Sequence, residues 1–301
     1  MTDNRILYLE CASGISGDMT VAALLDLGAD EKKLRQALDS LQLEGAQVHI
    51  SRVKKSGLDA CDFAVELDAA HENHDHDMAY LHGTAQENMH VHNCSHDHDH
   101  HHTYDQEHHH GHDHHHAHDH PHVHRGLQEI TQIIERADLT DGARALARRI
   151  FDILADAEAK AHGVPRGEVH FHEVGAVDSI IDIVAAAVCL DDLAPARIIC
   201  SPLAEGCGTV RCQHGVLPIP VPAVTNIVAA HGLVIHPTQV RGELVTPTGA
   251  AIAAAVQTCQ SGRPDGQETG QSSDSCVDSY TATYTDAYTI EGVGIGAGKR
   301  D

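Results

Sequence analysis

The chain lacks tryptophan altogether, and its 301 residues include only three phenylalanines and six tyrosines. Aliphatic side chains and alanine must therefore fill any core, which predicts alanine-rich helices that pack closely. Long apolar runs are also missing, because the most apolar stretch, residues 180–190, contains Asp182 and is too short to cross a bilayer. We therefore expect a globular protein with no membrane partner.

Positive charge is scarce as well. The 20 lysine and arginine residues are outnumbered by 44 aspartate and glutamate residues, which gives a formal net charge of −24. This balance argues against nucleic acid and anionic membranes as partners, since both bind through basic patches. The first residues form no apolar signal region, and the nine cysteines follow no regular disulfide spacing. We therefore expect a cytoplasmic protein with reduced thiols.

Histidine is the residue type in excess. No lysine or arginine lies between Lys55 and Arg125, and this part of the chain holds 22 of the 29 histidines. Imidazole suits nickel, copper and zinc as a ligand, and interleaved aspartates add negative charge. Too few apolar residues are present to bury a core, so we predict a disordered metal-binding insert over residues 69–124. The candidate metal ligands in its densest runs are His96, His98, His100, His101, His102, His108, His109, His110, His112, His114, His115 and His116.

The predicted elements form one α/β (or α+β) domain, residues 1–68 and 125–260, into which the insert is placed. The first part reads as strand, helix, helix and two paired strands, at residues 5–10, 18–27, 30–41, 47–54 and 59–67. Gly28 is the expected C-cap of the first helix, Asp30 the N-cap of the second, and Ser56-Gly57 the turn between the two strands. The second part mixes helices with short strands, so we predict a mixed sheet with alanine-rich helices. Residues 261–301 are expected to form a flexible loop and a junction to a C-terminal domain that the chain lacks.

A compact cluster of ligating side chains lies between His170 and Asp182. In an extended segment His170 and His172 point to one face, which makes them candidate metal ligands. Glu173 and Asp178 are the candidate acid or base groups. Asp178 also has a purely structural interpretation as a helix N-cap, and for Asp182, four residues later on the same helix face, the two interpretations stay open.

Two further loops precede predicted helices and resemble anion sites. Glycines in the first loop, residues 10–18, let backbone N–H groups point at an anion, with a helix dipole behind them. The second, residues 242–250, leaves another open helix N-terminus, and our hypothesis is that it forms a phosphate or carboxylate site together with the first loop. The structural alternative for the first loop is a tight turn in which Asp18 supports the helix N-terminus. For the second loop it is a helix cap at Thr246, followed by a proline. The candidate substrate-binding residues are Ser16, Gly17, Asp18, Thr246, Thr248 and Gly249.

Taken together, these blocks resemble the LarC family. The matching segments are Tyr-Leu-Glu-Cys-Ala-Ser-Gly-Ile-Ser-Gly-Asp-Met at residues 8–19, His-Phe-His-Glu-Val-Gly-Ala-Val-Asp-Ser-Ile-Ile-Asp at 170–182 and Gly-Glu-Leu-Val-Thr-Pro-Thr-Gly-Ala at 242–250. A histidine-rich insert between the first two blocks is also similar to family members.

The resemblance implies a lyase-class activity: insertion of Ni(II) into pyridinium-3,5-bisthiocarboxylic acid mononucleotide, the precursor of the nickel-pincer cofactor. It further implies that CTP and Mg²⁺ or Mn²⁺ act in a C-terminal half, and that a lactate racemase or epimerase apoenzyme receives the cofactor. This chain resembles the N-terminal half.

A second interpretation stays open beside the resemblance. A non-catalytic store or metallochaperone for nickel, zinc or copper would explain the histidine tract, although it would leave the three ordered motifs without a role.

Overall fold

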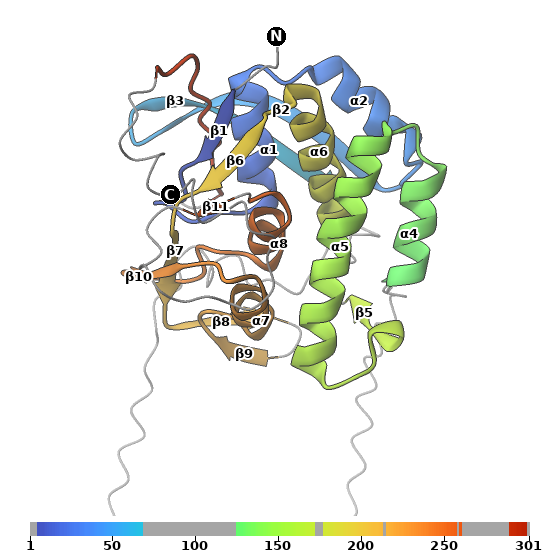
Figure 1. The fold of residues 1–301 in the computed structure, drawn as a ribbon, viewed down its shortest axis with the longest axis vertical. Helices are drawn as coiled ribbons and strands as arrows, with labels where there is room; N and C mark the ends of the chain where they lie inside the picture. Colours follow the sequence, from blue (N-terminus) through green and yellow to red (C-terminus); the bar gives the residue numbers. More distant parts are fainter. Residues whose placement is uncertain are drawn as a thin grey trace, which may run out of the picture.

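The computed structural model describes residues 5–68, 125–171, 177–212, 215–257, 259–260 and 289–299. The predicted histidine-rich insert and its twelve candidate ligands lie outside the described residues, as do His172 and Glu173. Within the described part the protein has the predicted α/β class, with small parallel and antiparallel sheets beside alanine-rich helices (Figure 1).

The first motif loop follows a strand of a three-stranded parallel sheet. The sheet has the order β1 (Ile6–Leu9), β6 (Arg197–Cys200) and β11 (Cys259–Gln260). Leu7 and Leu9 pack against the core, whereas Ile6 and Tyr8 on the opposite face of β1 are exposed. This alternation is the period-two pattern of a strand that buries one face.

Helices α1 (Gly17–Leu27), α6 (Val177–Leu193) and α8 (Pro247–Val256) pack against one another. Helix α5 (Asp141–His162) contacts α6, α8, α7 (Pro222–His231) and α4 (Leu127–Arg136). Alanines make the close approach possible: every residue from Thr248 to Val256 in α8 is buried. The closely packed, alanine-rich helices that the sequence predicts are therefore confirmed.

The predicted hairpin follows α2 (Glu31–Ser40). Strands β2 (Ala46–Lys55) and β3 (Leu58–Leu67) pair antiparallel through their whole length. Ser56 and Gly57 both have positive φ, as the two-residue turn of a hairpin requires. The turn was predicted at these two residues and is confirmed.

Smaller strands complete the molecule. Strands β7 (Leu203–Cys207) and β10 (Ile235–Arg241) are parallel, and β8 (Thr209–Cys212) and β9 (Gly215–Pro218) form a hairpin. The two-residue strands β4 (Arg125–Gly126) and β5 (His170–Phe171) pair antiparallel, and a 3-10 turn (Arg166–Glu168) precedes β5. No helix among the described residues is long and apolar enough to cross a bilayer.

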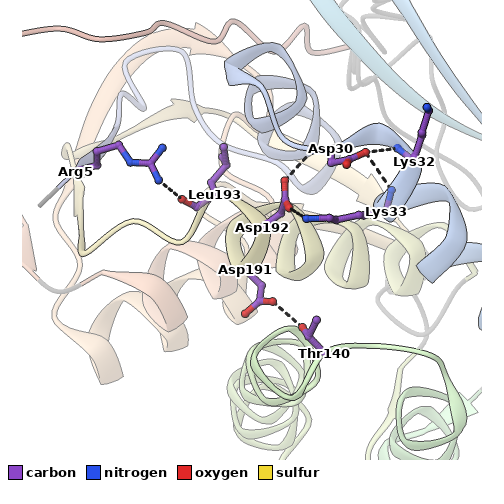
Figure 2. A network of polar contacts seen from close by, with 8 residues as sticks. All are labelled: Arg5, Asp30, Lys32, Lys33, Thr140, Asp191, Asp192 and Leu193. Atoms are coloured by element: carbon purple, nitrogen blue, oxygen red, sulfur yellow. Dashed lines mark hydrogen bonds and ion pairs between the residues drawn. The ribbon is translucent and has the colours of Figure 1, made fainter. Parts of the chain in front are cut away.

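Polar contacts fix the C-terminal end of α6 (Figure 2). The carboxylate of Asp192 pairs with Lys33 Nζ at 2.5 Å and accepts a hydrogen bond from the backbone N–H of Asp30 at 2.9 Å. Both bonds favour the ionised form and lower the pKa of Asp192. Asp191 accepts a hydrogen bond from the Thr140 hydroxyl at the start of α5, at 2.6 Å. These contacts hold α6 against α2 and α5, so that its opposite end is presented to the motif loops.

Residues 289–299 lie in an extended conformation beside β3 and α1 (Figure 1). The backbone N–H of Cys61 donates to Ile295 O at 2.9 Å, and that of Ala297 donates to Cys61 O at 2.7 Å. The N–H of Ile295 donates to the carboxylate of Asp26 at 2.8 Å. Part of the stretch predicted as a junction is thus packed onto the domain.

Glycines allow this segment to approach α1 closely. A Cβ atom on Gly294 would lie 2.1 Å from Ala23 O, and one on Gly296 would lie 2.0 Å from Met19 O. Both distances are far below van der Waals contact, and both neighbours are backbone atoms that cannot turn away. Glycine is therefore a packing requirement at positions 294 and 296.

Candidate functional site

The first and third motifs are joined directly. The backbone N–H of Ile15 donates to Leu244 O at 2.9 Å, and the N–H of Thr246 donates to Ile15 O at 3.1 Å. A Cβ atom on Gly249 would lie 2.2 Å from Ile15 O, so glycine is required where the loops touch. The N-termini of α1 and α8 consequently lie side by side, an arrangement that the sequence analysis raised as a hypothesis.

This junction lies at the carboxyl ends of β1 and β6. Ser201, directly after β6, accepts a hydrogen bond on its Oγ from the N–H of Cys11 at 2.8 Å. The N–H of Ser201 donates to Leu9 O at 3.0 Å. In open α/β sheets, ligands bind at this edge, outside the carboxyl ends of the strands.

Glu205 is a buried residue that the sequence analysis missed. Its Oε1 accepts hydrogen bonds from the backbone N–H groups of Gly206, Leu244 and Val245, at 2.7, 2.9 and 3.2 Å. The side chain is 1% exposed. Glu205 on β7 therefore fixes the loop that leads into α8, and a glutamate inside the otherwise apolar strand β7 was its only sequence signal.

The helix N-termini are capped by their own side chains. Asp18 Oδ1 accepts hydrogen bonds from the N–H of Met19 at 2.8 Å and from the Ser16 hydroxyl. In α8, Thr246 Oγ1 accepts from the N–H of Gly249 at 3.1 Å, and proline follows in the first turn. The structural roles predicted for Asp18 and Thr246 are confirmed. Substrate binding by these residues stays a prediction.

The second motif reaches the same point through Asp182. The backbone N–H of Asp18 donates to the Asp182 carboxylate, and a Cβ atom on Gly17 would lie 2.6 Å from its Oδ2. Asp182 Oδ1 is covered from solvent and has no hydrogen-bond partner among the described residues. Burial and the neighbouring charges of Asp18 and Asp178 raise the pKa of Asp182 well above its ordinary value.

Asp178 lies in the first turn of α6, where its Oδ1 accepts a hydrogen bond from the N–H of Ser179 at 2.9 Å. The side chain is half-buried. Asp178 is therefore the second residue of α6 and not the N-cap that the structural interpretation predicts, and a carboxylate in the first turn still favours the start of a helix.

Lys299 completes the cluster and was also missed. Its Nζ lies 2.9 Å from Asp62 Oδ1 and 3.3 Å from Phe63 O, and 4.0 Å from Asp18 Oδ2. Its positive charge opposes the rise in the pKa of Asp182. The candidate site therefore consists of Ser16, Gly17, Asp18, Asp178, Asp182, Thr246, Thr248, Gly249 and Lys299.

The side chains of the predicted metal ligands lie outside the described residues, although the backbone of His170 is described. The backbone of His170 belongs to β5, paired with Gly126, but its side chain lies outside the described residues. Within the described ranges, no group of three or more His, Cys, Asp or Glu side chains is placed to hold a metal ion. Cys11, which lies in the first loop, is buried, and burial raises the pKa of its thiol to about 11, which disfavours the thiolate that a soft metal needs.

The comparisons with known proteins agree that the chain belongs to the nickel insertion protein family. Residues 7–301 match the family model described as nickel insertion protein. The chain is 49% identical over 253 residues to the pyridinium-3,5-bisthiocarboxylic acid mononucleotide nickel insertion protein of Alkaliphilus metalliredigens, covering 84% of this chain and 52% of that protein. It is 46% identical over 252 residues to the protein of the same name from Clostridium acetobutylicum, covering 83% and 55%.

A putative nickel insertion protein of Pelobacter propionicus is 36% identical over 300 residues, which cover 99% of this chain and 57% of that protein. The chain thus spans about half the length of the curated relatives it matches. No solved structure matches it.

Proposed function

Because the chain belongs to the nickel insertion protein family, we propose that it takes part in inserting Ni(II) into pyridinium-3,5-bisthiocarboxylic acid mononucleotide. The observation that carries the proposal is the meeting of three motifs, distant in sequence, at the carboxyl edge of one parallel sheet. We take the product to be the nickel-pincer cofactor of lactate racemase-type enzymes, in which nickel is bonded to two sulfurs and one ring carbon.

In this proposal each part of the chain has its own role. The insert of residues 69–124 collects nickel, and His170 and His172 receive it. The paired N-termini of α1 and α8 bind the anionic precursor, because helix N-termini favour phosphate and carboxylate groups. Glu173 and Asp178 are the bases that the sequence analysis proposes for removing the ring proton.

We assign CTP and Mg²⁺ or Mn²⁺ to a C-terminal half, fused or separate, since the chain spans only about half of its relatives. No group of described residues fits a divalent ion, and no step through CTP is assigned to this chain. The recipient would be a racemase or epimerase apoenzyme. We also propose a cytoplasmic location, because the described cysteines are all free thiols.

The test supplies the 301-residue chain with nickel, CTP and the precursor, with and without the C-terminal half of a relative, and follows the product by mass. The proposal expects nickel-containing product when both halves are present. It is contradicted if the chain neither binds the precursor nor gives product in either mixture.

A second function, nickel storage or delivery without catalysis, is favoured by the histidine tract alone. Deleting residues 71–124 separates the two. Insertion predicts that product formation survives at high nickel concentration, whereas storage predicts that every nickel-dependent property disappears. A chain in which asparagine replaces the histidines of this segment is the matched control for its length.

A further inference from the structure

We propose that the carboxylate of Asp182 accepts the proton that the precursor's ring carbon loses when the nickel–carbon bond forms. The inference rests on the proposed function and deepens it, since the sequence analysis named only Glu173 and Asp178 as bases. In this step the ring C–H bond breaks, its electron pair becomes the nickel–carbon bond, and the proton goes to the carboxylate.

Asp182 is held where the three motifs meet. Gly17 leaves room for it, because any larger residue would place a Cβ atom within 2.6 Å of Oδ2. The N–H of Asp18 donates to the carboxylate and orients it. The fold therefore brings one carboxyl group against the N-terminus of α1, and the glycine at position 17 keeps a side chain out of the contact. This is the arrangement expected of a group that must be positioned accurately.

The three carboxylates of the site differ in how they are engaged. Asp18, in the first turn of α1, accepts a hydrogen bond from the N–H of Met19, and Asp178 accepts one from the N–H of Ser179 at the start of α6. Asp182 keeps one oxygen, Oδ1, that is covered and has no hydrogen-bond partner among the described residues. A buried polar atom without a partner is costly in a folded protein and calls for a functional explanation. A proton or a substrate atom would satisfy it.

The charges around Asp182 suit a cycle of proton release and uptake. Asp18 from α1 and Asp178 from α6 are the negative neighbours, and Lys299, itself paired with Asp62, is the positive one. With the site empty, burial and the negative neighbours favour protonated Asp182. An arriving Ni²⁺ favours the carboxylate, so a proton leaves to solvent. The carboxylate then takes the ring proton and returns to its resting form, with one proton released for each nickel–carbon bond.

The first experiment titrates Ni²⁺ into the 301-residue chain saturated with precursor, by calorimetry in buffers of different ionisation enthalpy. Wild type is compared with Asp182→Asn, Asp178→Asn and, as the matched exposed change, Asp39→Asn in α2. Every variant keeps the histidine tract and the protons that it releases. A difference in proton release between a variant and wild type therefore comes from the substituted carboxylate. We expect less proton release for Asp182→Asn alone.

The second experiment follows turnover with both halves present. Loss of a general base lowers the rate by about 10²-fold or more, so Asp182→Asn should form product at least that much more slowly while keeping its precursor affinity. Asp39→Asn should match wild type. A purely structural role would instead lower stability and leave the pH profile of the remaining rate unchanged.

Three outcomes would overturn the assignment of Asp182 as the base. Wild-type proton release and rate in Asp182→Asn would overturn the assignment and leave the proposed function standing. If Asp178→Asn loses both the proton release and the rate while Asp182→Asn keeps them, the base is Asp178, one turn earlier in α6, and the assignment to Asp182 is wrong. A wild-type chain that binds no precursor would remove the proposed function and this inference together.

Discussion

Replacing Gly296 by alanine should detach the extended segment of residues 289–299 from α1. A Cβ atom at this position would lie 2.0 Å from Met19 O and 2.8 Å from Ala23 N, and ordinary contact begins at 3.4 Å. The segment must therefore move outward by 1.4 Å, the difference between 3.4 and 2.0 Å. Such a shift breaks the two backbone hydrogen bonds that the segment makes with Cys61, at 2.9 and 2.7 Å.

Each of these hydrogen bonds contributes about 1 kcal/mol, so Gly296→Ala should lower the free energy of unfolding by about 2 kcal/mol. The measurement is urea denaturation followed by circular dichroism. The same variant should expose Cys61, which is 4% exposed in the intact protein, to a thiol reagent under native conditions, with the labelled peptide identified by mass.

The matched control is Gly292→Ala in the same segment. Its Cβ atom would meet only the end of the Leu27 side chain, at 3.1 Å, and a flexible side chain can move aside. We expect near-wild-type stability and no labelling of Cys61. Equal stability and equal labelling in the two variants would refute the packing argument.

Four other changes follow from the same structure. Thr246→Ala removes the cap of α8 and should cost about 1 kcal/mol in thermal denaturation, with wild-type stability as the contrary result. Glu205→Ala leaves three N–H groups, two of them buried, without their acceptor, at about 1 kcal/mol or more each, so a loss below about 1 kcal/mol in urea denaturation would count against that role. Because the folded-state pKa of Asp182 is raised, the folded protein holds a proton that the unfolded chain has lost, and stability falls as pH rises from the unfolded pKa through the folded one. Asp182→Asn should remove that slope and be the more stable protein at neutral pH, and parallel pH–stability curves would contradict this. Deleting residues 71–124 should lower the number of nickel ions bound at equilibrium dialysis without changing the thermal midpoint, and unchanged stoichiometry would count against the insert as the nickel-binding arm.

Local features of the fold could be predicted from the sequence because local interactions determine them. Asp30 caps α2 and Gly28 ends α1 in a left-handed conformation, both as predicted. The hairpin turn at Ser56 and Gly57 follows from the alternation on either side of it. These features depend on residues only a few positions apart.

The site itself depends on contacts between distant segments, and there the sequence was less informative. The sequence analysis identified the loops that contain Ser16 and Thr246, and it raised their joining as a hypothesis. Glu205 and Lys299 were missed, since each acts on residues far along the chain. The regular alternation of glycine in residues 292–298 was an available signal, because small residues on one face of a strand permit close approach to a helix.

The most direct test of the central claim, that the folded body rather than the histidine tract binds the precursor, is hydrogen exchange on the chain lacking residues 71–124. The exchange is measured with and without pyridinium-3,5-bisthiocarboxylic acid mononucleotide. The account predicts that the nucleotide slows exchange together at residues 15–19, 178–182 and 246–250. Unchanged exchange at all three segments under saturating nucleotide would contradict it.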